Sequence, residues 1–359
     1  MKLQTLRLKL PFGQTLGLAL ILFSLLLGAG EVLTRTRVFK SHFIADARGT
    51  RHNQFELQLG RLETIVAIEG SIDCIFLGNS MVWNGFDPEA FAQAYRHRTG
   101  QNLRCFNFGV DGMPVISAGA LAQILVHDYR PKLLIYGTDA RDYAVTREAE
   151  DTTVLLDTPW LRYRLGQFSF EGWLYEHSHL YRYRETLGHI MRFEKRYLVV
   201  IGAYALNRDN YGFGGDEKVG SFVSTPPDHH SDMGAVQYYS SLLSDYKMLP
   251  ENLVGLEQIV HNNRDGTQVL VIGMPVPETY FYFFGNGEQD YQSFLAGVRD
   301  VTEVNAAPFW PTTALHLIPD DGWVDYSHLN TKGARIFSQW LGQQLGEAAE
   351  QGLLAGLAP

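Results

Sequence analysis

The stretch CIFLGNS, residues 74–80, decides the fold that this sequence predicts. Its apolar run has the length of a short buried strand, and Gly-Asn-Ser marks the point where the strand ends. We therefore predict the first strand at residues 71–77. Ser80 then lies just past the carboxyl end of that strand, where open α/β sheets bind their ligands.

Further apolar runs and helical patterns alternate along the chain. Strands are predicted at residues 103–108, 132–136, 268–272 and 315–318. Helices are predicted at residues 88–99, 118–127, 253–261 and from 331 to about 344. Asp87 and Asn330 are the expected N-caps of the first and last of these helices. Strands that alternate with helices predict a mostly parallel α/β sheet.

Polar residues with catalytic chemistry follow the ends of the predicted strands. Ser80 follows the first strand, Gly112 the second, Asp139 the third, and Asp325 with His328 the fifth. A serine hydroxyl becomes a good nucleophile when an imidazole takes its proton and a carboxylate holds that imidazole. We predict Ser80 as the nucleophile, His328 as general base and then acid, and Asp325 as the group that fixes the imidazole tautomer.

These blocks resemble the SGNH (GDSL-like) hydrolases. More narrowly, the chain is similar to membrane-anchored members that work beside cell-envelope O-acyltransferases, such as the D-alanyl transfer proteins of teichoic acid and the alginate acetylation proteins. The matching motifs are GNS at 78–80, NFGVDG at 107–112 and DYSHLNTKGA at 325–334. The resemblance covers residues 70–143 and 267–345, and it implies a flavodoxin-like three-layer domain.

The resemblance also implies an oxyanion hole, in which donors stabilise the charge of the tetrahedral intermediate. The backbone N–H groups of Ser80 and Gly112 are the expected donors. The family's third donor is an asparagine side chain, but the matching position here is Asp139. An ionised carboxylate facing the hole would repel an oxyanion, and Asp139→Asn would then speed hydrolysis.

We call residues 137–139, which read Gly-Thr-Asp where the family has Gly-x-Asn, together with the residues directly after them, the third block. Several alternatives stay open for it. Asp139 is either protonated and donating, or pointed away, or it leaves the role to Thr138. Arg141 or Asp142 is a further alternative. Substrate contacts are predicted at residues beside the nucleophile and after the fourth strand: Asn79, Trp83, Tyr280 and Tyr282. Simple packing of the aromatic run 280–284 is an equal alternative to a platform for an acyl group or a sugar.

Composition excludes some classes of function. The formal net charge is −9, which argues against a nucleic-acid-binding surface. Cys74 and Cys105 are predicted to be buried thiols in strands, with a bridge between neighbouring strands as the alternative. We predict no metal site and no cofactor, and we interpret the pair His229 and His230 as part of a solvated loop.

The N-terminus is predicted to anchor the chain in a membrane. Residues 11–30 carry no charge, and residues 16–30 are almost wholly apolar. Cations stand on both sides of this run: Lys2, Arg7 and Lys9 before it, and Arg35, Arg37 and Lys40 after it. An uncleaved signal anchor is favoured over a signal peptide cleaved near residues 28–30.

Four segments follow from these observations. Residues 1–40 are the predicted cytoplasmic tail, anchor and juxtamembrane segment, and residues 41–348 are an SGNH-like domain. A cap is inserted at about 145–265, and residues 349–359 form a C-terminal tail. Residues 31–70 are interpreted as a stalk and lead-in.

The insertion is rich in aromatic and arginine residues between 160 and 189. A helical cap with an ordinary amphipathic core is the favoured interpretation. The alternatives are a glycan cleft and a surface that rests on a membrane. Residues 212–232 are predicted to form a long loop.

The predicted function is serine-dependent acyl-ester chemistry. The resemblance implies O-acyl transfer, of the acetyl type, to a cell-envelope polysaccharide or glycolipid, with a multi-span membrane O-acyltransferase as partner. It also implies a single-pass protein of the cytoplasmic membrane with an extracytoplasmic catalytic domain. The alternatives are a carbohydrate or lipid esterase that uses water, and a catalytically quiet scaffold of polysaccharide assembly.

Overall fold

The chain folds around one parallel β-sheet in a computed structural model that describes residues 11–43, 50, 52–144, 158–195, 211–217, 233–264 and 266–352. Five strands pair in the order β2-β1-β3-β4-β5, and every pairing is parallel. The strands are β1 (Cys74–Gly78), β2 (Cys105–Gly109), β3 (Leu133–Thr138), β4 (Gln268–Gly273) and β5 (Phe309–Pro311). This is the flavodoxin-like order, so the predicted mostly parallel α/β sheet is confirmed.

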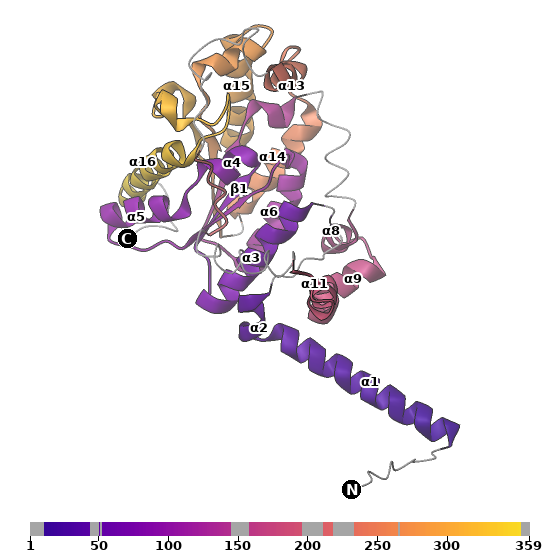
Figure 1. Cartoon of the computed structure of the whole chain (residues 1–359). Coiled ribbons are helices and arrows are strands. Elements are labelled where there is room, and N and C mark those ends of the chain that lie inside the picture. The colour runs from indigo at the N-terminus through magenta and orange to yellow at the C-terminus, as the bar shows by residue number, and fades with distance from the viewer. Residues whose placement is uncertain are drawn as a thin grey trace.

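Helices cover both faces of the sheet (Figure 1). α5 (Pro88–Thr99) packs against α16 (Thr331–Glu350). On the other face α14 (Pro250–His261) packs between α6 (Val115–Tyr129) and α15 (Glu288–Val304). Right-handed crossovers in this strand order place the two groups on opposite faces, which gives three layers.

The predicted helix caps are confirmed. The Asp87 side chain accepts hydrogen bonds from two backbone N–H groups of the first turn of α5, and Pro88 is the first residue of that helix. Gly100 ends it in the left-handed conformation that glycine favours. Asn330 caps α16, which continues to Glu350, past the predicted end of the domain.

The last strand differs from its prediction. Residues 315–318 do not form a strand, because only Phe309–Pro311 pairs with β4. Pro311 has no N–H with which to extend the ladder. Leu315 instead ends a 3-10 helix, η6 (Thr313–Leu315), and its side chain is 47% exposed.

The predicted stalk is largely a helix of the domain. α3 (Asn53–Glu69) packs beside β2, and it buries Phe55, Leu59 and Leu62 in the main core. These residues are three and four positions apart, so they lie on one face of the helix. Their spacing is the sequence signal for a core helix, and the stalk interpretation missed it.

Helices follow β3 where an insertion is predicted. They are η1 (Ala140–Tyr143), α8 (Pro159–Arg164), α9 (Phe170–His177), α10 (His179–Arg182), α11 (Arg184–Met191) and α13 (Met233–Leu243). We call α8 to α11 the cap. Trp160, Tyr175 and Tyr183 are buried, as expected for a helical cap with an amphipathic core, and Trp160 and Tyr175 belong to the main hydrophobic core of the domain. α14 belongs to the sheet rather than to the cap, because it packs on α6.

A short described part of the insertion, residues 211–217, crosses the edge of the sheet. The Asn107 N–H of β2 donates to the Tyr211 carbonyl at 2.8 Å, and the Thr331 N–H donates to the Asp216 carbonyl at 2.7 Å. The segment therefore runs from the edge strand to the start of α16. The rest of the predicted loop, with His229 and His230, lies outside the described residues.

The two cysteines are register partners on β1 and β2. Both Cys74 and Cys105 are buried, and both are free thiols. The preferred prediction of buried thiols is therefore confirmed over an inter-strand bridge. The remaining short elements are α4 (Ser80–Gly85), η4 (Asn262–Arg264), η5 (Glu278–Phe283) and η7 (Asp320–Gly322).

The N-terminal helix projects from the domain (Figure 1). α1 (Phe12–Arg35) has 24 residues and is apolar and long enough to cross a membrane, and none of its most apolar window is buried in the protein. α2 (Arg37–His42) follows it, and Phe39 of α2 packs edge-on against Tyr183 of the cap. In the part of the chain that the structure describes, the last turns of α1 and the short α2 join this helix to the domain.

Gly255→Ala should destabilise the fold, because α14 crosses α6 at this glycine. A methyl group there would lie 2.6 Å from the Val115 carbonyl carbon and oxygen, which are backbone atoms that cannot turn aside. We expect a loss of about 1–3 kcal/mol in the free energy of unfolding, measured by urea denaturation. The matched control is Gly188→Ala in α11, where the nearest atom is 3.7 Å away and no loss is expected. Equal midpoints for Gly255→Ala and wild type would contradict the close crossing.

Candidate active site

Ser80 lies at a tight turn from strand to helix. It is the first residue of α4, directly after β1 and Asn79. A side chain at Gly78 would lie 2.6 Å from the Gly137 carbonyl oxygen of β3, so this turn requires glycine. The Asn79 side chain caps α4 through the Met81 N–H at 2.8 Å. The turn thus holds the Ser80 hydroxyl at the carboxyl edge of the sheet.

Asp325 and His328 meet Ser80 at this edge. The distance from His328 Nε2 to Ser80 Oγ is 2.7 Å. On the other side of the imidazole ring, His328 Nδ1 lies 2.7 Å from Asp325 Oδ2 and 3.0 Å from Oδ1. An ionised carboxylate can only accept at Nδ1, so the neutral ring carries its proton there and Nε2 is free to accept the Ser80 proton. The structure brings the three predicted catalytic residues into one hydrogen-bonded chain.

Asp325 is held in its ionised form. Burial alone would raise the pKa of its carboxyl group. Hydrogen bonding to His328, the positive charge of the imidazole when it is protonated, and two backbone N–H groups together hold that pKa well below its usual value. The two N–H groups are those of Ser327 and His328, each 2.8 Å from Asp325 Oδ1. The carboxylate therefore stays charged and oriented across the neutral pH range.

A tyrosine of the insertion supports this loop. The Tyr239 hydroxyl lies 2.7 Å from Ser327 Oγ and donates to Asp325 Oδ1 at 3.4 Å. Tyr239 is buried, on α13. Sequence reasoning missed this residue because no motif marks it, and its place beside Asp325 comes from the path of the insertion.

Two backbone donors are available for an oxyanion. Within the described part of the chain, the N–H groups of Ser80 and Gly112 donate no hydrogen bond. Gly112 has a positive φ of 67°, which turns the loop after β2. The loop is tied to the start of α3, because the Asp111 N–H donates to Gln54 Oε1 at 2.6 Å. α3 thus supports the predicted oxyanion glycine.

Asp139 is engaged elsewhere, which differs from the prediction that it faces the oxyanion. Its Oδ2 lies 2.5 Å from Arg141 Nε, and its Oδ1 accepts a hydrogen bond from the Tyr280 hydroxyl at 2.8 Å. The Asp139 and Arg141 side chains are only 1% and 3% exposed. A buried carboxylate paired in this way neither repels an oxyanion nor donates to one. Among the alternatives, the structure shows Asp139 pointing away into an ion pair.

The neighbouring candidates of the third block are also occupied. Asp142 Oδ1 accepts a hydrogen bond from the Asn79 side chain at 2.8 Å, and the Thr138 hydroxyl lies 3.0 Å from the Tyr143 hydroxyl. Arg141 Nη2 is buried without a hydrogen-bond partner in the described residues. The block therefore stiffens the floor of the site through Asn79 rather than supplying an amide donor.

The predicted substrate contacts fall in different surroundings. Asn79 is 2% exposed and Tyr280 is fully buried, because both bind the third block. The structure thus places these two side chains in the interior instead of at a cleft surface. Tyr282 is 63% exposed. Trp83 is half-buried under the insertion, whose Gly214 N–H donates to the Trp83 carbonyl at 2.9 Å.

Comparisons with known proteins found similar solved structures, among them two esterases. No protein-family model matches the chain, and no curated protein matches it. Among solved structures, a carbohydrate acetylesterase family member from Sinorhizobium meliloti is 11% identical, with a TM-score of 0.36 over 78% of this chain and 98% of that one. The inhibitor-bound aryl esterase of M. smegmatis is 10% identical, with a TM-score of 0.35 over 77% and 99%.

A gut microbial diltiazem-metabolizing enzyme is 14% identical, with a TM-score of 0.38 over 76% of this chain. This chain spans about half, 47%, of the length of that enzyme. Because all of these TM-scores are below 0.5, our account of the fold and the site depends on strand order and side-chain geometry. Within the described ranges, no group of three His, Cys, Asp or Glu side chains is arranged to hold a metal.

Asp139→Asn should destabilise the protein, because it leaves the buried Arg141 guanidinium without its carboxylate. We expect a loss of about 3–5 kcal/mol in the free energy of unfolding, measured by urea denaturation. The double variant Asp139→Asn with Arg141→Met removes both charges and should recover much of that loss. Unchanged stability together with faster ester hydrolysis would contradict the ion pair, and it would return Asp139 to the oxyanion hole.

Proposed function

We propose that this protein is a serine-dependent acyl-ester enzyme of the cell envelope. The observation that carries the proposal is the chain of hydrogen bonds from Asp325 through His328 to Ser80 Oγ. A purely structural role would not require a serine hydroxyl at Nε2 of an imidazole and an ionised carboxylate at its Nδ1. Nucleophilic catalysis by a serine triad uses all three in this order.

The reaction proceeds in two steps, acylation of Ser80 and transfer of the acyl group to an acceptor. Ser80 Oγ attacks the carbonyl carbon of an ester while His328 Nε2 takes the hydroxyl proton. The oxyanion receives hydrogen bonds from the N–H groups of Ser80 and Gly112. When the intermediate collapses, His328 gives its proton to the leaving alcohol, and the acyl group stays on Ser80. An acceptor hydroxyl then loses its proton to His328 and attacks the carbonyl carbon of the acyl-serine. When this second intermediate collapses, the bond to Ser80 Oγ breaks, His328 returns the proton to Ser80 Oγ, and the new ester leaves.

The acceptor in this proposal is a hydroxyl group of a cell-envelope polysaccharide or glycolipid, and the acyl group is of the acetyl type. Support comes from the resemblance to envelope O-acylation proteins and from the apolar α1 that leads into the domain. In this arrangement α1 crosses the cytoplasmic membrane once and the domain lies outside it. A multi-span O-acyltransferase in the same membrane would supply the acyl group.

The experiment supplies p-nitrophenyl acetate as donor to the full-length protein in detergent, with and without an envelope oligosaccharide as acceptor. We expect release of p-nitrophenol and an acetylated oligosaccharide in the mass spectrum. Ser80→Ala should lose on the order of 10⁴–10⁶ in rate, and Asp325→Asn about 10⁴. Ser293→Ala, a serine on the outer face of α15, is the matched control and should keep the wild-type rate.

The outcomes separate the three candidate functions. Acetylated acceptor that requires Ser80 supports transfer. Acetate alone, at any acceptor concentration, would replace transfer by hydrolysis with water as acceptor. A wild-type rate no higher than that of Ser80→Ala would contradict catalysis and favour a scaffold of polysaccharide assembly.

A further inference from the structure

We propose that the cap rests on the surface of the lipid bilayer that holds α1, through three exposed aromatic side chains, Phe168, Phe170 and Trp173. We call these three the aromatic face. The inference depends on the proposed membrane placement of α1. It adds a second contact between the protein and the bilayer. That contact fixes how the carboxyl edge of the sheet, with Ser80, is oriented relative to the bilayer.

The end of α1 is bound firmly to the cap. The Glu31 carboxylate accepts hydrogen bonds from Ser178 Oγ at 2.9 Å and from the N–H groups of His179 and Leu180 at 2.9 and 3.0 Å. Arg35 donates to the His177 carbonyl at 2.7 Å. Four hydrogen bonds thus hold the last turns of α1 against the junction of α9 and α10.

The contact begins where the apolar part of α1 ends. Residues 11–30 carry no charge, and Gly30 lies directly against Leu180 of the cap, because a methyl group on Gly30 would be 3.2 Å from the Leu180 side chain. A methyl group on Gly17 or Gly28 would have no atom of the described residues within 4 Å. The level at which α1 leaves the bilayer is therefore also the level at which the cap begins.

The aromatic face stands beside this junction. Phe168, Phe170 and Trp173 are 80%, 65% and 40% exposed, and the Phe170 and Trp173 rings stack with their centroids 6.0 Å apart. Figure 1 shows α9 and α11 on the side of the domain from which α1 projects. Aromatic rings on a surface next to a membrane span are typical of the bilayer interface, where apolar and polar surroundings meet. Because the aromatic face lies next to the end of α1, the bilayer that holds α1 is the surface that covers it.

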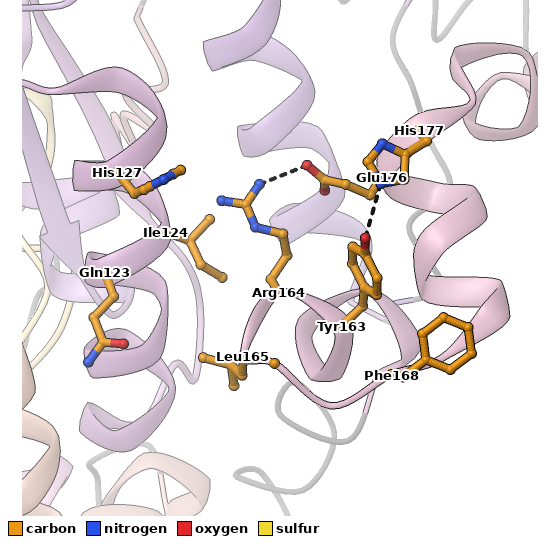
Figure 2. Close-up of a pocket in the computed structure, with 10 residues that line it drawn as sticks. Gln123, Ile124, His127, Tyr163, Arg164, Leu165, Phe168, Glu176 and His177 are labelled. Carbon is orange, nitrogen blue, oxygen red and sulfur yellow. Dashed lines mark hydrogen bonds and ion pairs between the residues drawn. The ribbon is translucent and has the colours of Figure 1, made fainter.

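The arginine in the hollow beside the aromatic face, Arg164, is already paired. A hollow of about 650 Å³ lies between α6 and the cap. Figure 2 shows Phe168 on a loop among the residues that line it. In this hollow Arg164 binds Glu176 at 2.8 Å and Asp128 at 2.6 Å, and the Tyr163 hydroxyl lies 3.0 Å from His177 Nε2. The contact with lipid therefore depends on burial of apolar rings, and it should not require anionic lipid.

This placement directs the active site away from the bilayer. α6 begins three residues after Gly112, and its other end, with Gln123 and His127, lines the hollow beside the cap. A helix of this length spans about 22 Å. The oxyanion donors and the aromatic face thus lie near opposite ends of α6. The acceptor reaches Ser80 from the aqueous side, which favours an envelope polysaccharide over a glycolipid of the same bilayer.

The test uses the full-length protein in lipid nanodiscs. An environment-sensitive NBD fluorophore is attached to one introduced cysteine at a time: Phe168→Cys, Phe170→Cys, Leu20→Cys in α1, and Tyr282→Cys as an exposed aromatic position after β4. Cys74 and Cys105 are buried, and the unsubstituted protein measures any labelling of them. Quenching by doxyl-labelled lipid reports contact with the bilayer. The nanodiscs contain phosphatidylcholine alone or with phosphatidylglycerol.

We expect quenching at positions 168, 170 and 20, none at 282, and the same quenching in both lipid mixtures. Quenching at 20 without quenching at 168 and 170 would overturn the inference while leaving the anchor intact. Absence of quenching at all positions would instead overturn the membrane placement of α1. A blue-shifted but unquenched fluorophore at 168 or 170 would show that protein, such as a second copy of the chain, covers the face, and this would also overturn the inference.

Discussion

The hydrogen bond between His328 Nε2 and Ser80 Oγ is the interaction on which the proposed activity depends. It joins two residues that are 248 positions apart in the chain. Parallel strands make this possible, because their carboxyl ends meet at one edge of the sheet. The strand order places β1 inside the sheet, between β2 and β3, so the loops after these strands lie beside Ser80. Asp325 then orients the imidazole from a loop that leads into α16.

The third block shows how this site is stiffened. Asp139 and Arg141 form a buried ion pair that also binds Tyr280, and Asp142 binds the Asn79 side chain next to Ser80. A buried pair of this kind contributes little net stability, but the loss of one partner is costly. The same positions could not both carry this network and offer an amide to the oxyanion. Within the described residues, the backbone N–H groups of Ser80 and Gly112 remain without hydrogen bonds.

Local sequence signals predicted the parts of the fold that depend on local chemistry. The strands at β1 to β4, the Asp87 cap and the Asn330 cap were all predictable, because apolar runs and capping side chains act within a few residues. β5 was misplaced because a three-residue strand has too few residues for a pattern. Tyr239 and the partner of Asp139 could not be predicted in the same way. Their contacts arise from tertiary packing and from the path of an insertion with no motif.

The measurement that tests the central claim most directly is covalent labelling of the folded, full-length protein with a fluorophosphonate, followed by peptide mass spectrometry. Such a probe reacts with a serine whose hydroxyl is activated by a base. If Ser80, His328 and Asp325 form a working nucleophile, the label lies on Ser80 and disappears in both Ser80→Ala and His328→Ala. A label that persists in His328→Ala, or that is found on another serine, would contradict the account.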